Sequence, residues 1–377
     1  MARLVWVTPD FAAHPRSGGA IRSHRLVSEL ARHHEVSLIV VGHCADPDQV
    51  QQSTGVASLQ VFPPARGVGA RLIAWSRGWP LAVARGWNRA AAQAVRRTAG
   101  PGVTTIIDFS YVAAYRPVGV PYVLHLHNVE SDLQAVLPQR AGWRRWEAAR
   151  EHRLLRRWEH ALVADPLARV VTVSRDDADR LGVAAVVVPN GTDVPQPPPP
   201  ESPHGPLLFI GTLDYGPNAE GLAWWAHRVW PLLPPGSKPL RVVGRGGRAA
   251  LGALADHPSL DVVGELADIS GELASARAVI VPLLHGGGSR LKIVEALAWQ
   301  RPVVTTSAGA SGLEGLTPGV HYLSSNDPQG FAQAVLMLND PLVTRSLVSQ
   351  GRQWAEGMSW ALLAPRFLSA LPESPER

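Results

Sequence analysis

The amino-acid sequence predicts an α/β protein with two doubly wound parallel-sheet domains. Short, β-branched apolar runs alternate with stretches of helical periodicity along the chain, which is typical of parallel strands covered by helices on both faces. The 377 residues exceed one ordinary core and suit two domains. A proline-rich run at 195–203, which cannot pair in a sheet, separates the two halves.

The expected strands of the first half are 4–8, 36–41, 59–62, 104–108, 122–127, 170–173 and 185–188, with helices such as 20–33 and 87–97 between them. Those of the second half are 207–210, 241–243, 260–263, 278–282, 303–305 and 321–323. We expect a first domain at 1–194, a linker at 195–206, a second domain at 207–357, and a C-terminal helix within 358–377 that packs back on the first domain. Ligands bind at the carboxyl edge of such sheets, so we expect the site in a central cleft that both domains face.

Composition limits the class of protein. No apolar run reaches the roughly 18–20 residues that span a bilayer, and the apolar start at 4–7 is too short for a signal peptide. Cys44 is the single cysteine, so neither an intrachain disulfide nor a cysteine metal site is expected. We expect a cytoplasmic location, either free or bound at the inner face of the membrane.

The first half carries a basic region. Between Gln49 and Ile107 there is no acidic residue, whereas seven arginines and three tryptophans fall there. They are Arg66, Arg71, Arg77, Arg85, Arg89, Arg96 and Arg97, with Trp75, Trp79 and Trp87. Such a surface suits an anionic partner, and we expect a membrane surface at the first five arginines rather than nucleic acid. The alternative is a solvated helix face. The basic amphipathic helix expected at 143–162 is interpreted as burying its apolar stripe against the first domain.

The most informative motif is the glycine-rich loop at 286–288. It follows an apolar strand and leaves bare backbone N–H groups, and the helix expected to open near Ser289 directs its positive dipole end at the loop. Arg290 and Lys292 add positive charge, and Glu295 lies on the first turns of the helix. Only two of the 36 basic residues are lysines, so the choice of lysine at 292 favours a flexible point charge. This pattern predicts a diphosphate site; a solvated helix start is the alternative.

Three weaker motifs accompany it. Gly18 and Gly19 form a turn after the first strand, without the spacing of dinucleotide-binding folds, which argues against an NAD enzyme. Strand alternation would place His125 and His127 on one face at the carboxyl edge, followed by Asn128 and Glu130, where imidazoles either meet a substrate or support the structure. The turn at 190–193 is either a ligand loop or the domain exit.

In this order, the segments resemble the glycosyltransferases of the GT-B fold, most closely the retaining nucleotide-sugar enzymes of family 4. The matching segments are Gly18-Gly19, His127-Asn128, Ser174 with 190–193, 209–212, and the glycine-rich loop through Glu295 into 302–304. Two departures stand out. The family's first glutamate, eight positions before Glu295, is Gly287 here, and Gly211-Thr212 lacks the nearby Arg and Lys that grip the diphosphate in relatives. Arg290 and Lys292 would then supply that charge.

The resemblance implies that a sugar, of hexosyl type, passes from a nucleoside-diphosphate sugar to a hydroxyl acceptor with retained configuration. It implies no cofactor or metal, and a glycan, lipid-linked or small-molecule acceptor in bacterial glycan, glycolipid or natural-product glycoside synthesis. The diphosphate ligands would be Gly211, Thr212, Gly286, Gly287, Gly288, Ser289, Arg290 and Lys292. Glu295 would hold the ribose and His127 would act at the reacting centre, and the cleft would be lined by Gly18, Gly19, His125, Asn128 and Asn190.

Two alternatives share the architecture. A nucleotide-sugar 2-epimerase binds the same donor, but it needs carboxylates that are scarce in the predicted site. A non-catalytic carbohydrate- or membrane-binding derivative of the fold would account for the missing glutamate.

Overall fold

The computed structural model describes the chain except residues 16, 66, 133–142, 286–289 and 373–377. The chain divides into two compact units. Unit 1 comprises Met1–Pro189 together with Trp360–Arg377, and unit 2 comprises Asn190–Ser359.

Unit 1 is built on a seven-stranded sheet in the order β3-β2-β1-β4-β5-β6-β7, with every neighbouring pair parallel. The strands are β1 (Arg3–Ala12), β2 (Glu35–Ala45), β3 (Ser58–Phe62), β4 (Val103–Asp108), β5 (Tyr122–His125), β6 (Ala168–Thr172) and β7 (Val186–Val187). The helices are α1 (Gly18–Ala31), α2 (Pro47–Thr54), α3 (Gly67–Arg77), α4 (Leu81–Arg85), α5 (Arg89–Thr98), the 3₁₀ helix η1 (Ser110–Tyr115), α7 (Trp143–Val163), α8 (Arg175–Leu181) and α16 (Trp360–Leu368).

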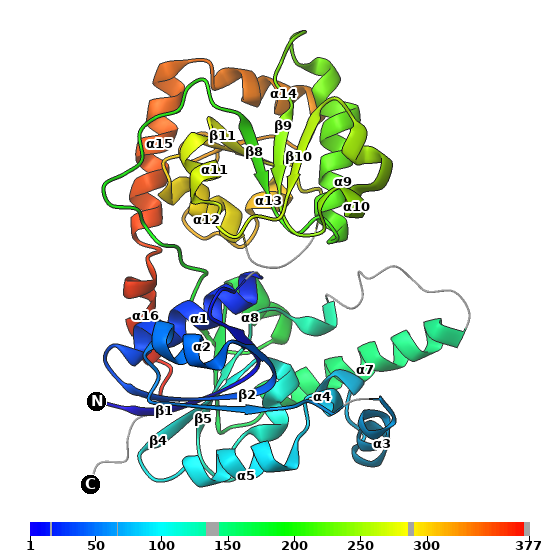
Figure 1. The fold of residues 1–377 in the computed structure, drawn as a ribbon, viewed down its shortest axis with the longest axis vertical. Helices are drawn as coiled ribbons and strands as arrows, with labels where there is room; N and C mark the ends of the chain where they lie inside the picture. Colours follow the sequence, from blue (N-terminus) through cyan, green and yellow to red (C-terminus); the bar gives the residue numbers. More distant parts are fainter. Residues whose placement is uncertain (16, 66, 133–142, 286–289, 373–377) are drawn as a thin grey trace. The chain divides into compact units, whose positions relative to one another are not determined.

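Helices cover both faces of this sheet, with α1 and α2 on one side and α5 on the other (Figure 1). Alternation along β1 explains the two layers, because successive side chains point to opposite faces. Val5 and Val7 lie in the core cluster that contains Val95 of α5. Trp6, between them, stacks on Phe367 of α16 with ring centroids 5.5 Å apart.

Unit 2 contains a six-stranded sheet in the order β10-β9-β8-β11-β12-β13, again with parallel neighbours. The strands are β8 (Leu207–Ile210), β9 (Leu240–Val243), β10 (Leu260–Gly264), β11 (Ala278–Val281), β12 (Val303–Thr305) and β13 (Leu323–Ser324). The helices are α9 (Gly216–Trp224), the π-helical turn η2 (Trp225–Val229), η3 (Trp230–Leu232), α10 (Gly247–Leu251), η4 (Gly252–Asp256), α11 (Ser270–Ser275), α12 (Leu291–Ala298), α13 (Ser307–Ala310), α14 (Pro328–Met337) and α15 (Pro341–Glu356).

The strand orders place one topological switch point in each sheet. In unit 1 the chain reverses direction of winding between β1 and β4, and in unit 2 between β8 and β11. Loops part at the carboxyl ends of these strands and leave room for a ligand. The fold therefore directs attention to Asp108 at the end of β4 and to Gly211 just after β8.

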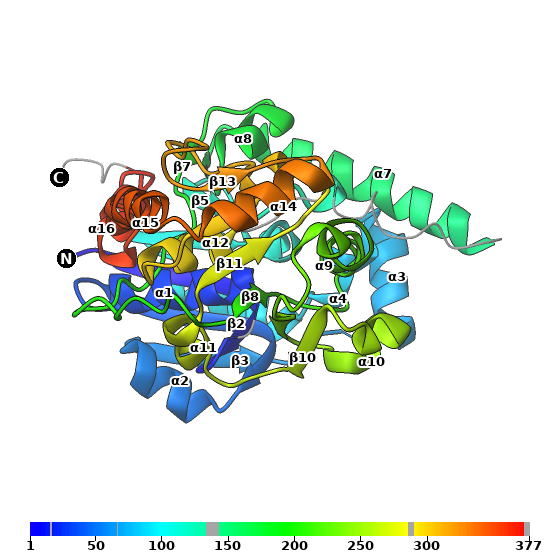
Figure 2. The same ribbon diagram turned by 90° about the horizontal axis from the view of Figure 1, so that it is seen from above.

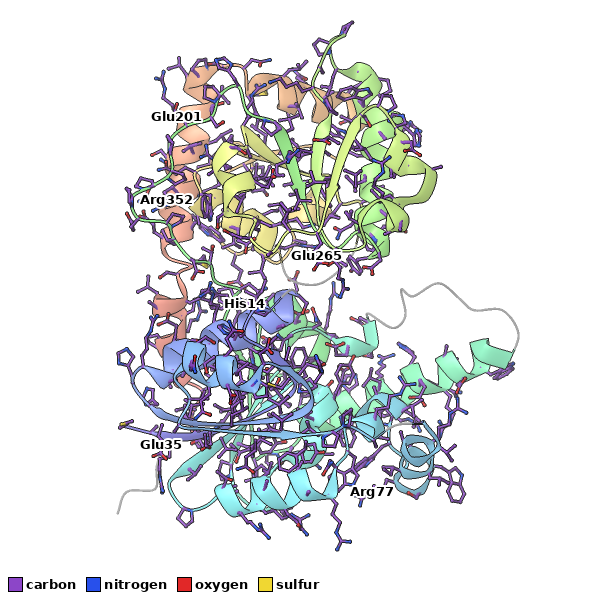
Figure 3. All side chains as sticks on the ribbon, viewed as in Figure 1. His14, Glu35, Arg77, Glu201, Glu265 and Arg352 are labelled. Carbon is purple, nitrogen blue, oxygen red and sulfur yellow. The ribbon has the colours of Figure 1, made fainter. Side chains whose placement is uncertain are left out.

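The proline-rich segment is part of unit 2, so the expected linker at 195–206 and the boundary at 194 need correction. Arg352 donates to the carbonyl of Pro195 (2.9 Å), and Arg301 donates to that of Pro200 (2.7 Å). Both arginines are almost fully buried, and Figure 3 labels Arg352 and Glu201 along this stretch. A segment without sheet pairing is thus held to unit 2 by buried guanidinium groups, which satisfy its carbonyls.

Helix α7 is buried along only part of its length. Leu155 and Leu162 are buried, as expected of the apolar stripe, and Glu159 beside them accepts the backbone N–H groups of Glu130 and Ser131. Trp146, near the start of the helix, is 77% exposed. Figures 1 and 2 both show this first part of α7 extending away from the sheet. Within the described residues, no helix is long and apolar enough to cross a membrane.

Candidate functional site

In unit 1 the carboxylate of Asp108 is the centre of a buried hydrogen-bond network. It is fully buried, and its Oδ2 accepts from Nε1 of Trp6 (3.0 Å) and from Oγ of Ser23 (2.7 Å). Its Oδ1 lies 2.9 Å from Nδ1 of His125 and 2.6 Å from Nε2 of His127. Burial alone would raise the pKa of Asp108, but the charge and hydrogen bonds of the two histidines outweigh it and hold this pKa well below its usual range. The carboxylate is therefore ionised.

Arg22 on α1 completes this network from the other side of His125. Its Nε donates to Nε2 of His125 across 2.8 Å, and its terminal nitrogens donate to the carbonyls of Val188 and Pro189. Burial, with the charges of His127 and Arg22, lowers the pKa of His125 to about 3. The His125 ring is therefore neutral, and both of its nitrogens are occupied by protein groups.

His127 lies just beyond the end of β5, which stops at His125, so the expected strand to 127 is two residues too long. Both histidines nevertheless reach the same oxygen of Asp108, and their ring centroids are 4.4 Å apart. Phe109 stacks on His127 at 3.8 Å with nearly parallel rings, and Phe109 itself has a positive φ of 78°. A strained non-glycine residue of this kind often marks a functional site.

The second nitrogen of His127 lies close to Gly19 at the start of α1. Among the described residues, its Nδ1 has no hydrogen-bond partner although it is buried. A Cβ at Gly19 would lie 3.3 Å from this Nδ1 and 3.0 Å from the ring of Phe109, so only glycine leaves the ring edge open here. Burial lowers the pKa of His127 and Asp108 opposes this effect, which leaves the ring neutral at pH 7.

Asp108, His125 and His127 also bring three potential metal ligands within 4.8 Å of one another. The positions of the protons on these side chains argue against a bound metal ion here. A guanidinium group only donates, so Nε2 of His125 accepts from Arg22 and Nδ1 must carry the proton of the neutral ring. That nitrogen has no lone pair for a metal ion, and the cluster is better described as a hydrogen-bonded network.

In unit 2, Lys292 lies at the switch point between β8 and β11. Its ammonium group donates to Oδ1 of Asn218 (2.9 Å) and sits 4.5 Å from the ring centre of Phe209. Burial, assisted by Arg290 and opposed by Glu295, lowers the pKa of Lys292 to about 7. The amide of Asn218 in turn donates to the carbonyl of Thr212 (2.8 Å). A cation is thus fixed beside the end of β8.

The backbone beside Lys292 is closely packed. A Cβ at Gly211 would lie 2.8 Å from Nζ of Lys292, and one at Gly244 would lie 1.7 Å from the carbonyl oxygen of Gly211. Gly244 therefore needs glycine, because its neighbour is backbone, whereas a side chain at Gly211 would displace the ammonium group of Lys292. This arrangement leaves the loops after β8 and β9 without side chains at the point where Lys292 presents its charge.

The remaining predicted donor ligands are placed as follows. Helix α12 begins at Leu291, so the expected start near Ser289 is two residues early. Arg290 precedes it and donates to the carbonyls of Ala308 (2.8 Å) and Ser311 (3.3 Å), and Glu295 lies one turn after Lys292. The predicted ligands Gly286, Gly287, Gly288 and Ser289 lie outside the described residues.

The predicted cleft residues fall in both units. Gly18 is the first residue of α1, which Ser17 caps, and Asn128 contacts Glu130 at 3.4 Å. His125 is fully buried and supports the network from within. Asn190 is buried and opens unit 2.

Sequence reasoning missed Asp108, Arg22, Phe109 and Asn218. A signal existed for Asp108, because a lone acid ends an apolar strand at the predicted carboxyl edge. Arg22 and Asn218 lie in helical stretches where a polar residue is ordinarily solvated, so their sequence context gives no comparable signal.

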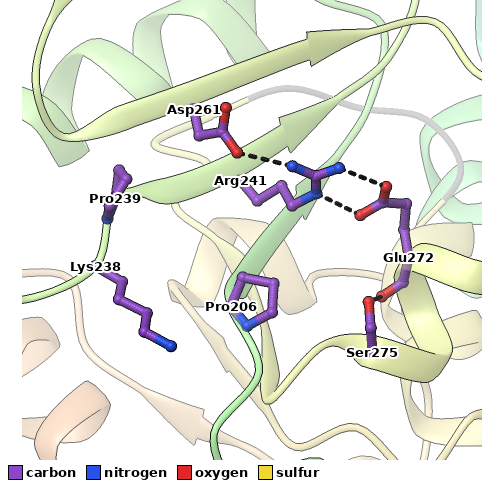
Figure 4. A pocket seen from close by; sticks show the side chains of 7 residues that line it. All are labelled: Pro206, Lys238, Pro239, Arg241, Asp261, Glu272 and Ser275. Atoms are coloured by element: carbon purple, nitrogen blue, oxygen red, sulfur yellow. Dashed lines mark hydrogen bonds and ion pairs between the residues drawn. The ribbon is translucent and has the colours of Figure 1, made fainter.

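A cavity of about 400 Å³ lies at the opposite edge of the unit 2 sheet (Figure 4). Its lining includes Pro206 and Pro239, which directly precede β8 and β9. Arg241 pairs there with Glu272 (2.6 Å) and Asp261 (2.8 Å), so its charge is neutralised. This cavity at the amino ends of the strands is not the predicted diphosphate site.

Part of the chain matches a known protein family, and the whole chain is similar in fold to solved structures. Residues 205–340 match the family model described as "Glycosyl transferases group 1". No curated protein sequence matches the chain. Among solved structures, HepE from Anabaena in complex with UDP and glucose is 15% identical, with 98% of this chain and 99% of that chain covered and a TM-score of 0.66.

Two further structures cover 97% of this chain and 98% of theirs at 15% identity. They are the sucrose-phosphate synthase from Thermosynechococcus elongatus, with a TM-score of 0.70, and WaaG, a glycosyltransferase involved in lipopolysaccharide biosynthesis, with a TM-score of 0.65. The two Rossmann-like parallel-sheet units and these neighbours define the GT-B fold, as the sequence predicted. The fold and the family match together make the protein an enzyme of the glycosyltransferase class. Within it, residues 205–340 are the part that matches the group 1 glycosyltransferase model.

Proposed function

We propose that the protein transfers a sugar from a nucleoside-diphosphate sugar to an acceptor hydroxyl with retention of the anomeric configuration. The observation that carries the proposal is the ammonium group of Lys292, held by Asn218 beside the glycine backbone after β8. Neighbouring structures described with UDP, or with UDP-glucose, support a nucleoside-diphosphate donor. Retention rests on the resemblance to family 4.

The chemistry asks for positive charge near the leaving group. The bond between the anomeric carbon and the diphosphate oxygen breaks, and negative charge grows on the diphosphate. The acceptor oxygen bonds to the same face of the carbon, and its proton passes to the departing diphosphate oxygen. Fixed cations and N–H donors stabilise that charge more in the transition state than in the bound donor. Lys292 supplies the cation in unit 2, and the backbone of Gly211 and Thr212 together with Arg290 and residues 286–289 would complete the diphosphate site. The proposed transfer uses neither a metal ion nor a cofactor.

Glu295 and His127 have separate proposed roles. A carboxylate accepts hydrogen bonds from a pair of ribose hydroxyls, which suits Glu295 on the same helix as Lys292. His127 in unit 1 would contact the sugar near the reacting carbon, since its neutral ring has a buried nitrogen without a partner among the described residues.

The direct test is to incubate the purified protein with UDP-glucose and other nucleotide sugars. Thermal stabilisation would identify the donor, and release of nucleoside diphosphate that depends on an added acceptor would establish transfer. An epimerised sugar formed without an acceptor would support the 2-epimerase. Binding without turnover on any acceptor would support the non-catalytic derivative.

We further propose that unit 1 docks on an anionic membrane surface through α3. Val68, Leu72 and Trp75 lie on one face of this helix and are 73%, 59% and 79% exposed, while Ala70 and Ala74 pack the opposite face inwards. An apolar face this exposed on a short helix is typical of a segment that lies in the membrane interface. Figures 1 and 2 show α3 at the rim of unit 1.

The charges around α3 fit lipid headgroups, with one adjustment to the predicted patch. Arg71, Arg77, Arg85 and Arg89 are exposed, whereas Arg66 lies outside the described residues. Arg77 is packed 4.7 Å from the ring centres of both Trp79 and Trp87, which also contact each other. Those two tryptophans therefore belong to an aromatic cluster, and the interfacial role falls to Trp75. This would place the enzyme at the inner face of the membrane, within reach of a lipid-linked acceptor.

A further inference from the structure

The proton positions around Asp108 are determined by the groups that can only donate. Trp6 and Ser23 donate to Oδ2, and an indole N–H has no other option. Arg22 donates to Nε2 of His125, which forces the single ring proton of neutral His125 onto Nδ1. That proton points at Oδ1 of Asp108 across 2.9 Å.

The state of His127 follows from the same argument. Oδ1 of Asp108 is an ionised acceptor, so the 2.6 Å contact with Nε2 of His127 requires the proton to be on Nε2. In the neutral ring, Nδ1 then carries a lone pair. This is the nitrogen that lacks a partner among the described residues and lies against the Gly19 backbone. A free imidazole would exchange between two tautomers, whereas this one is held in a single tautomer.

We propose that Asp108 is a positioning residue that, with Arg22 and His125, fixes the proton of His127 on Nε2 and presents the Nδ1 lone pair to a substrate hydroxyl. This inference rests on the function proposed for His127, and it limits the ligand of His127 to a hydroxyl group. A lone pair accepts a hydrogen bond from a hydroxyl, but it repels the unprotonated oxygen of a diphosphate. His127 therefore recognises a sugar hydroxyl, and the diphosphate is left to unit 2.

The first test does not use activity. In the full-length protein labelled with ¹⁵N-histidine, His127 should show a protonated Nε2 and an unprotonated Nδ1 between pH 7 and 9, and His125 the opposite tautomer. His127→Gln and His125→Gln assign the two signals among the 14 histidines. A protonated Nδ1 on His127, averaged tautomers or an imidazolium at pH 7 would overturn the proposal. This spectrum tests the proposal even if variants of Asp108 do not fold.

The second test separates positioning from structural support. Asp108→Asn replaces an acceptor-only group by an amide that can donate to the histidines, and kcat should fall about 10- to 100-fold with a smaller change in KM, as for other groups that orient a functional histidine. Tyr122→Phe is the matched control, because it removes a hydrogen bond to Asp165 (3.1 Å) at the other end of β5. It should leave kcat unchanged.

The outcomes can be told apart. A folded Asp108→Asn enzyme with the kcat of the parent, or an equal loss of kcat in Tyr122→Phe, would overturn the positioning role. If His127→Ala itself kept full kcat while the ¹⁵N spectrum showed the expected tautomers, the proposed contact of His127 with substrate would fail and the proton arrangement would stand.

Discussion

Nζ of Lys292 on α12 and Oδ1 of Asn218 on α9 are 2.9 Å apart, and this contact joins two helices on opposite sides of the unit 2 switch point. The ammonium group is held in place before any ligand arrives. Burial lowers its pKa to about 7, so its charge depends on pH near neutrality.

Diphosphate affinity should therefore fall as the pH rises. Below pH 7 Lys292 is charged in the free protein; above it, binding must restore the proton that the free lysine has lost. The Kd for UDP should rise up to about tenfold per pH unit between pH 7 and 9. In Lys292→Met the Kd should be higher and nearly constant over this range. Calorimetry at several pH values would check it, and an unchanged slope in the variant would assign the titration to another group.

Glu295 should be tested with a nucleoside as well as a nucleotide. Glu295→Gln removes a charge that raises the pKa of Lys292, so UDP binding should weaken in any case. A ribose contact predicts that uridine binding weakens too, by about 1.5–3 kcal/mol for a lost charge-assisted hydrogen bond. Uridine affinity equal to that of the parent would leave Glu295 acting only through the lysine.

Arg290→Ala should cost stability as well as affinity. Its guanidinium group donates to two backbone carbonyls, Ala308 and Ser311, which the alanine would leave without this donor. We expect a lower Tm and a greater loss of UDP binding than of uridine binding. An equal loss for both ligands, with the Tm lowered, would show that Arg290 acts only as a support for the loop before α13.

His127→Ala should lower kcat by about tenfold or more while the donor Kd changes little. The proposed contact lies near the bond that breaks, so its loss affects the transition state more than the bound donor. Steady-state rates combined with donor titration separate the two quantities. A parallel rise in Kd with constant kcat would instead make His127 a binding residue.

Membrane docking should depend on the apolar face of α3. Leu72→Ser with Trp75→Ser should abolish sedimentation with anionic vesicles, and Arg71, Arg85 and Arg89 replaced together by Ser should weaken it. Binding should also fall as salt rises, since screening limits the reach of charges to about 8 Å at 0.15 M. Leu342→Ser, a 71% exposed leucine of unit 2, is the matched control. Equal sedimentation with neutral vesicles would contradict the role of the arginines.

The fold was predictable because its signals are local. The strand at 207–210 coincides with β8, since a short apolar run between turn residues is read without knowledge of its partners. The hydrogen-bond networks were harder to predict, because their partners lie far apart in the sequence. Arg22 reaches a carbonyl 167 positions away, and Ser23 reaches Asp108 over 85 positions. Lys292 was singled out because lysine is rare in this chain, but its partner Asn218 lies 74 residues earlier.

The return of the chain to unit 1 has a consequence for synthesis on the ribosome. Phe367 of α16 covers Trp6 and lies edge-on to His125 at 5.2 Å, so the core beneath the histidine network is closed by nearly the last described residues. Unit 2 is continuous and can complete its core while translation proceeds. Unit 1 must wait, with the Asp108 cluster uncovered, until α16 leaves the exit tunnel. Truncation before Trp360 should therefore leave unit 2 intact and unit 1 without the side chain that covers the hydrogen-bond network of Asp108.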